Sequence, residues 1–226
     1  MKLCLVTEHS LNTVWQERLS EVSKQDVVVF GFNGLGLVSY KKELSGETEY
    51  FQDLAKFSKQ ISSVVISGCD TDTYGVFRHS VVVAEKGKIL GVTDMTHSVD
   101  ESEFVAGGNY RVYDTCVGKI GIIVGEDLFF PESSSVLALC DADLIICIYK
   151  KQENTMPQIM LRAGAYANGV CMALCAEGYY AVADIRGNVV CAGSTDVVKV
   201  NVKLERDYHD VGIRRRGVCR DNGVVY

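Results

Sequence analysis

Short apolar runs, separated by glycine and polar residues, recur along the whole of the 226-residue chain. Many of them are rich in valine and isoleucine, which is typical of strands that are buried on both faces. The pattern predicts strands at 2–7, 26–30, 63–67, 77–85, 88–93, 111–116, 119–124, 143–148 and 170–175, then a closing meander that turns at 186–188 and ends near Leu204. Residues 77–93 read as a hairpin that turns at Lys86-Gly87.

Other segments repeat their apolar residues at helical spacing. Trp15, Leu19 and Val22 predict one helix, which Asn12 or Thr13 would cap. Ser45 is expected to cap a second helix, and two more are expected at 131–140 and 156–168, each with a proline at its start. The buried side of the second helix would carry Phe51, Leu54, Ala55 and Ile61.

Strands that alternate with helices, without a linker, a low-complexity tract or an internal repeat, indicate one α/β domain over residues 1–226. Hydrophobic residues make up 47 % of the chain, which is typical of an ordered globular protein. The net charge of −6 argues against a nucleic-acid surface and against an acidic membrane surface. No apolar run is long enough to span a membrane, and residues 1–6 read as a strand rather than a signal peptide.

Nine cysteines lie mostly inside apolar segments, and none forms a Cys-x-x-Cys pair. An odd number of thiols in core strands suits a reducing compartment, so a cytoplasmic location is expected.

The segment from Gly118 to Glu132 carries the most specific motif. It reads as a buried strand, a sharp turn and a helix that begins at Pro131. It resembles the signature of the carbon–nitrogen hydrolases, the nitrilase and amidase superfamily, which is roughly G-K-[IV]-G-x-x-[IV]-C-x-D-x-x-[FY]-P-E. The frame positions are met by Gly118, Lys119, Gly121, Asp127, Phe130, Pro131 and Glu132. The cysteine position holds Gly125.

The resemblance extends over nearly the whole chain. Segments similar to the family's are 28–32, 104–108, 142–146, 163–168 and 220–226. In the fourth, Gly164 and Ala167 stand where the family has arginine and glutamate. The resemblance implies a four-layer α-β-β-α sandwich and a homodimer.

The family's mechanism, as the resemblance implies it, needs a cysteine nucleophile, a glutamate that transfers protons and a lysine that stabilises the developing anion. Phe32, Asp94 and Gly125 align with the glutamate, lysine and cysteine, so no catalytic position is intact. The nearest residues of the required types lie too far along the chain for a shifted alignment to supply them. An expected pocket would be formed by Phe32, Asp94, Gly125, Glu126 and Tyr149, with Phe32 occupying it or walling it off.

Several other residues have a chemical and a structural interpretation. Glu126 and Asp94 could form a carboxylate pair for acid–base chemistry, although a solvated or ion-paired Glu126 is the simpler interpretation. Asp127 is expected to bond nearby groups, and His97 to be a surface loop residue, because no spacing of metal ligands accompanies it. No metal and no cofactor are expected. Cys171 and Cys175 share one strand face as core residues.

Arg214-Arg215-Arg216 is the only basic run and is expected to meet acidic residues of a partner subunit.

Two hypotheses follow. In the first, the protein is a catalytically inactive relative that binds a small molecule, acts as a scaffold or serves as a partner subunit for an active relative. In the second, it is an amidase-like hydrolase of C–N bonds, other than peptide bonds, with a rebuilt site that does not use the cysteine position. The first is favoured, because a hydrolase activity would be inherited from the fold, and fold alone does not establish function.

Overall fold

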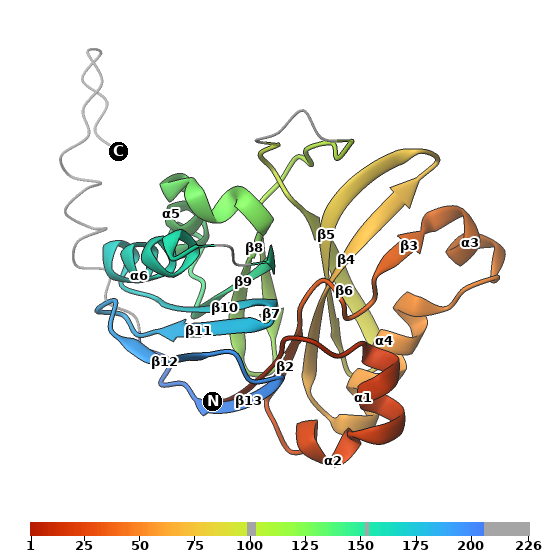
Figure 1. Cartoon of the computed structure of the whole chain (residues 1–226), viewed down its shortest axis with the longest axis horizontal. Coiled ribbons are helices and arrows are strands. Elements are labelled where there is room, and N and C mark those ends of the chain that lie inside the picture. The colour runs from red at the N-terminus through yellow and green to blue at the C-terminus, as the bar shows by residue number, and fades with distance from the viewer. Residues whose placement is uncertain (99–102, 152–153, 206–226) are drawn as a thin grey trace.

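The strand β1 (Lys2–Val6) shows how the chain builds its layers. Leu3 and Leu5 face one apolar core, whereas Cys4 and Val6 face another, and all four are fully buried. Alternate side chains of a strand point to opposite faces of the sheet, so a strand that is buried on both faces belongs to an inner layer. The computed structural model in Figure 1 describes residues 1–98, 103–151 and 154–205. The basic run 214–216 and the segment 220–226 lie outside the described residues.

The first sheet has the strand order β13-β1-β2-β4-β5-β6, and β3 pairs with β4 at one end. Its central strands β1, β2 and β4 are parallel, and β13 joins the edge antiparallel to β1. Its other strands are β2 (Val27–Phe30), β3 (Leu37–Ser39), β4 (Val64–Thr73), β5 (Val76–Glu85), β6 (Lys88–Asp94) and β13 (Val197–Asn201).

The second sheet has the order β12-β11-β10-β9-β8-β7, with parallel pairing among β8, β9 and β10. Its strands are β7 (Arg111–Thr115), β8 (Gly118–Val124), β9 (Leu144–Lys151), β10 (Cys171–Glu177), β11 (Tyr179–Ala183) and β12 (Val189–Gly193). The two sheets share one apolar core, to which both contribute residues such as Leu5 and Ile146.

Helices complete the outer layers, on the outer side of each sheet (Figure 1). The elements are α1 (Leu11–Glu17), α2 (Leu19–Val22), α3 (Tyr40–Ser45), α4 (Tyr50–Ile61), the 3₁₀ helix η1 (Gly125–Phe129), α5 (Pro131–Leu139) and α6 (Met156–Asn168). One outer core packs Phe57 of α4 against Phe30, and the other packs Leu137 and Leu161 of α5 and α6 against the second sheet. The predicted four-layer α-β-β-α sandwich is confirmed.

Most of the predicted elements occur within two residues of their expected limits. The single helix expected from Trp15, Leu19 and Val22 is instead divided at Arg18 into α1 and α2, and two caps were wrong. Ser10, rather than Asn12 or Thr13, caps α1, since its hydroxyl accepts a hydrogen bond from the N–H of Thr13. Ser45 ends α3 instead of opening α4, whose N-cap is Glu49. The short α3 was missed because its residues have no apolar period.

The closing meander was also predicted incorrectly. Strands β10, β11 and β12 do form it, but β13 leaves the second sheet and pairs with β1 of the first. Strand β4 extends six residues beyond the expected end at Ser67, because its polar end 70–73 pairs with both β3 and β5. The hairpin turn was predicted correctly: Lys86 and Gly87 both have positive φ, +51° and +81°.

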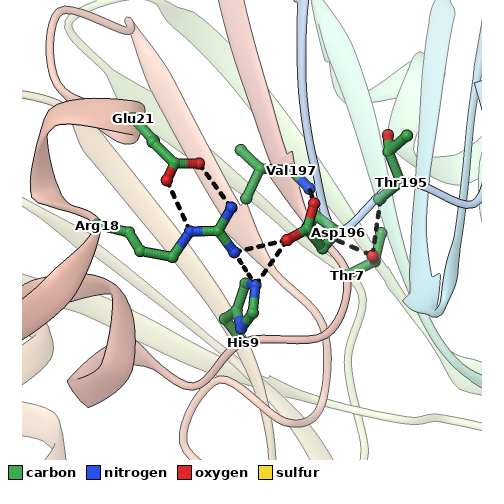
Figure 2. Close-up of polar contacts among 7 residues, drawn as sticks. All are labelled: Thr7, His9, Arg18, Glu21, Thr195, Asp196 and Val197. Atoms are coloured by element: carbon green, nitrogen blue, oxygen red, sulfur yellow. Dashed lines mark hydrogen bonds and ion pairs between the residues drawn. The ribbon is translucent and has the colours of Figure 1, made fainter.

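A cluster of polar and charged side chains joins residues 9–21, near the start of the chain, to Asp196, which precedes β13 (Figure 2). Arg18, between α1 and α2, donates to both carboxylate oxygens of Glu21 at 2.7 and 2.8 Å and to Asp196 Oδ2 at 2.6 Å. His9 Nε2 lies 2.9 Å from the same Asp196 oxygen and also contacts the Arg18 guanidinium. We call His9, Arg18, Glu21 and Asp196 the Arg18 cluster. It ties the first two helices to the segment before β13.

Among the described residues, no helix is long and apolar enough to cross a membrane.

Candidate functional site

The turn that follows β8 places Gly125 at the carboxyl end of the second sheet. Gly125 has φ +56°, in the left-handed region that glycine adopts without strain, and it opens η1. Strand β9 runs parallel to β8 and ends beside it, which brings Tyr149 and Lys150 to the same edge. Carboxyl ends of parallel strands are a common place for binding sites in α/β folds.

A cavity of about 400 Å³ opens at this edge, and we call it the Phe32 cavity. Four of the five expected pocket residues line it: Phe32, Gly125, Glu126 and Tyr149. Six lining residues were not foreseen: His79, Met95, Lys150, Lys151, Asn154 and Pro157. This volume suits a small molecule.

Asp94 does not line the cavity, which corrects its expected place in the pocket. It pairs with Ser80 across the β5–β6 ladder, and the Ser80 hydroxyl donates to Asp94 Oδ1 at 2.7 Å. Arg78 Nε lies 3.8 Å from the other carboxylate oxygen. Because strand side chains alternate between faces, the next residue, Met95, takes the inward position. The carboxylate pair of Asp94 and Glu126 therefore does not form within the cavity.

Met95 and Phe32 restrict the cavity next to Gly125. A Cβ atom added to Gly125 would lie 3.0 Å from the Met95 sulfur, and Met95 is only 3 % exposed. Phe32 is 8 % exposed, and its ring meets His79 edge-on at 5.5 Å between centroids. Phe32 thus forms a wall of the cavity but does not fill it.

Asp127 is almost fully buried and organises the segment that follows Met95. Its carboxylate accepts hydrogen bonds from the backbone N–H of Thr96 and His97 at 2.8 and 2.9 Å, and from the Thr96 hydroxyl at 2.8 Å. The predicted structural role of Asp127 is confirmed.

His97 is not the exposed loop residue that was expected. Its Nδ1 lies 2.8 Å from Asp127 Oδ1, and its ring stacks on Phe130 with a 3.8 Å centroid distance. His97 therefore anchors the segment on η1 and is partly buried.

One wall of the Phe32 cavity carries a cluster that sequence reasoning missed. His79 Nδ1 lies 2.6 Å from Asp70 Oδ1, and Lys150 Nζ donates to Asp70 Oδ2 at 3.2 Å. Phe104 stacks on the His79 ring at 3.8 Å, and Lys150 Nζ lies 4.8 Å from the Phe104 ring centre. We call Asp70, His79 and Lys150 the His79 cluster.

The electrostatic balance of this cluster favours an ionised Asp70. Burial alone raises the pKa of Asp70, but the hydrogen bond and charge of His79, together with Lys150, outweigh it and lower that pKa below its ordinary value. The sequence could have indicated the Asp70–His79 pair only if β4 had been predicted to its full length, because its extension past Ser67 places Asp70 opposite His79.

Thiols lie away from the cavity in the described part of the chain. Cys171 and Cys175 face the core between the sheets, as predicted. Burial raises the pKa of Cys175 to about 12 and that of Cys147 well above its ordinary value, so both stay protonated. No group of three or more histidine, cysteine or acidic side chains that could hold a metal ion occurs in residues 1–98, 103–151 and 154–205.

A second, smaller cavity of about 170 Å³ lies between α5 and α6. Gly164 and Ala167 line it, at the two positions where the resemblance has arginine and glutamate. Asn168 remains, and its amide donates to Ser134 Oγ at 2.9 Å. The small side chains leave open a space beside this bond.

Comparison with known proteins gives consistent matches. The carbon–nitrogen hydrolase family matches residues 11–206. A probable nitrilase of Schizosaccharomyces pombe is 24 % identical over 110 residues, which make up 46 % of this chain and 40 % of that protein. The matched part of the chain therefore spans less than half the length of that curated relative.

Solved structures show the same fold at low identity. Nit3 of Saccharomyces cerevisiae, a member of branch 10 of the nitrilase superfamily, has a TM-score of 0.73 and 18 % identity, covering 98 % of this chain and 96 % of that one. A variant of the amidase from Nesterenkonia AN1 has a TM-score of 0.76 and 17 % identity, covering 96 % and 95 %. In another structure of that amidase, acrylamide has added to the active site cysteine.

Proposed function

Because the chain belongs to the carbon–nitrogen hydrolase family, and because none of the described residues that line its Phe32 cavity is a cysteine, we propose that it is a catalytically inactive member that binds a small molecule there. The observation that carries this proposal is the contact between Met95 and Gly125. The Met95 sulfur lies 3.0 Å from the position that a Cβ atom on Gly125 would take, which crowds any side chain there, and Gly125 itself offers no nucleophile.

The remaining lining residues agree with binding rather than with the family's chemistry. Among the ten that line the cavity in the described chain there is no cysteine, serine or threonine to form a covalent intermediate. Phe32 cannot transfer a proton, and the Met95 thioether carries no positive charge. Groups that act as one catalytic unit lose most of their effect together, so only residual catalysis remains when such a set is broken.

A second candidate function is hydrolysis of C–N bonds by a rebuilt site. The His79 cluster favours it, because Asp70 orients His79 next to the cavity, as a general base requires. The lining that the structure describes offers this candidate no cysteine, serine or threonine, so its simplest route is attack by a water molecule that His79 activates. We place it second.

We also propose that the protein assembles with a second copy or with an active relative. Support comes from the outer helices α5 and α6, whose exposed apolar side chains include Val136, Leu139, Ile159 and Tyr166. Light scattering at micromolar concentration is expected to give about twice the 24.8 kDa mass of one chain. A mass of one chain would contradict assembly with a second copy.

We propose a reducing compartment, the cytoplasm, for the same chain. Eight cysteines of the described residues are free thiols, and five of them are buried.

The test of the main proposal is a hydrolysis screen combined with a binding screen. Purified protein is incubated with amides, nitriles and N-carbamoyl compounds, with and without iodoacetamide, while thermal shift reports binding of neutral, cationic and anionic small molecules. We expect ligand-induced stabilisation without turnover. Turnover that alkylation abolishes would refute the proposal, and turnover that alkylation spares would favour the second candidate.

A further inference from the structure

Within the described residues, one ring nitrogen of His79 is bound by the protein and the other is not. Asp70 holds Nδ1 at 2.6 Å, so a neutral imidazole carries its proton on Nδ1. The other ring nitrogen, Nε2, has no hydrogen-bond partner among the residues that the structure describes, although the His79 side chain is only 13 % exposed and lines the cavity. Nε2 is therefore left for a ligand.

The charges around His79 are balanced while His79 is neutral. Lys150 and Lys151 bring two positive charges to the cavity and Glu126 brings one negative charge, while Asp70 adds a second negative charge through its contacts with His79 and Lys150. Arg78, the neighbour of His79 on β5, faces Asp94 on the other side of the sheet. An anion that enters the cavity adds one negative charge, which a proton on His79 would offset.

The remaining lining residues select the body of the ligand. Phe32, Met95, Tyr149 and Pro157 supply apolar and aromatic surface, and the cavity volume of about 400 Å³ holds a compact molecule. An inorganic anion would leave this apolar surface in contact with water. The site therefore suits an organic acid with an apolar body.

We propose that the Phe32 cavity binds a small organic carboxylate, whose oxygens accept hydrogen bonds from protonated His79 Nε2 and from the Lys150 ammonium, and that binding takes up a proton. This inference rests on the proposed ligand-binding function and names the class of ligand. Asp70 is a positioning residue, because it touches His79 and Lys150 rather than the ligand.

The test is isothermal titration calorimetry of the whole chain with benzoate, benzamide and inorganic phosphate, run between about pH 6 and about pH 8.5, where histidine changes its charge. Buffers of different ionisation enthalpy count the protons exchanged. Benzoate is expected to bind with uptake of up to one proton, and its dissociation constant is expected to rise by up to about tenfold per pH unit as the pH is raised. Benzamide and phosphate bind at least about tenfold more weakly.

Variants separate the roles of the charged groups. His79→Gln removes the pH dependence, and Lys150→Met weakens benzoate binding by about tenfold or more. Glu126→Gln removes the opposing carboxylate and strengthens binding. His9→Gln, in the Arg18 cluster, is the matched histidine control and leaves benzoate binding unchanged.

Three results would overturn the inference: equal affinity for benzoate and benzamide, a benzoate affinity independent of pH, or no benzoate binding at millimolar concentration. If the thermal-shift screen still finds neutral ligands that protect the protein, the proposed binding function stands and only the ligand class is wrong. Because Lys150 is half-exposed, Lys150→Met folds even if His79→Gln does not.

Discussion

Two histidine–aspartate pairs, each beside a cation, occur in this protein and are built for different tasks. In the His79 cluster, Asp70 uses one oxygen for His79 and the other for Lys150. In the Arg18 cluster, His9 and Arg18 converge on the same oxygen of Asp196 (Figure 2). The same residue types thus produce two arrangements. We call the His79 cluster the open arrangement, because a histidine nitrogen faces a cavity, and the Arg18 cluster the closed arrangement.

The difference lies in which histidine nitrogen is consumed. His9 uses Nε2 for its contact with Asp196, and His9 lines none of the cavities formed by the described residues. His79 uses Nδ1 for its hydrogen bond with Asp70, and its ring lines a cavity with Nε2 unbonded among the described residues. A histidine–aspartate pair indicates a ligand site only when the second nitrogen reaches open space.

The largest expected effect comes from the wall of the open arrangement. Phe32→Ala removes the buried ring that meets His79, and the unfolding free energy should fall by about 3–5 kcal/mol, the usual range for a buried phenylalanine. Urea denaturation measures it, with Leu44→Ala, an exposed apolar residue, as the control that changes little. A loss below about 1 kcal/mol would mean that Phe32 does not support the fold.

Sequence reasoning predicted the layers and most strands because apolar period and β-branched content determine them locally. It also brought Phe32, Gly125, Glu126 and Tyr149 to one pocket. It placed Asp94 there wrongly, because a shift of one residue along a strand exchanges the two faces of the sheet.

The His79 cluster escaped prediction for a different reason. Asp70 and His79 face each other across the β4–β5 pair of the first sheet, and Lys150 of β9 reaches them only because the two sheets pack face to face. Asp70 and Lys150 are 80 positions apart in the chain. No local period or spacing encodes such a contact.

A smaller effect on folding stability is expected when acid protonates the closed arrangement, the Arg18 cluster. The hydrogen bond from Arg18, followed by that from His9, holds the pKa of Asp196 well below its ordinary range. A depressed carboxylate pKa stabilises the fold above the unfolded-state pKa, and this stabilisation is lost as the pH falls through the folded-state value. Asp196→Asn should therefore cost about 1 kcal/mol at neutral pH, because solvent screens the pair, and should weaken the loss of stability below about pH 4.

Urea titrations at several pH values would test this, with Asp70→Asn as the matched variant of the open pair. Asp196→Asn should leave benzoate binding unchanged, whereas Asp70→Asn should weaken it. Equal losses of binding in both variants would erase the distinction between the two clusters.

The smallest expected effect concerns the thiols. Iodoacetamide at neutral pH should modify the exposed Cys116 and Cys140 of the native protein and spare the buried Cys147 and Cys175. Benzoate binding should not change, because the cavity lining that the structure describes contains no cysteine. Peptide mass spectrometry locates the adducts, and an adduct on Cys147 or Cys175 accompanied by lost binding would speak against the inactive site.

The central claim is that the cavity takes up a ligand on His79 and leaves His9 untouched. Nuclear magnetic resonance of the imidazole nitrogens, recorded while benzoate is added slightly above neutral pH, observes both histidines in one experiment. The account predicts that the His79 ring nitrogens move to the protonated form as benzoate saturates the protein, while those of His9 stay in place. Saturation with benzoate that leaves His79 unprotonated, or that shifts His9 instead, would contradict it.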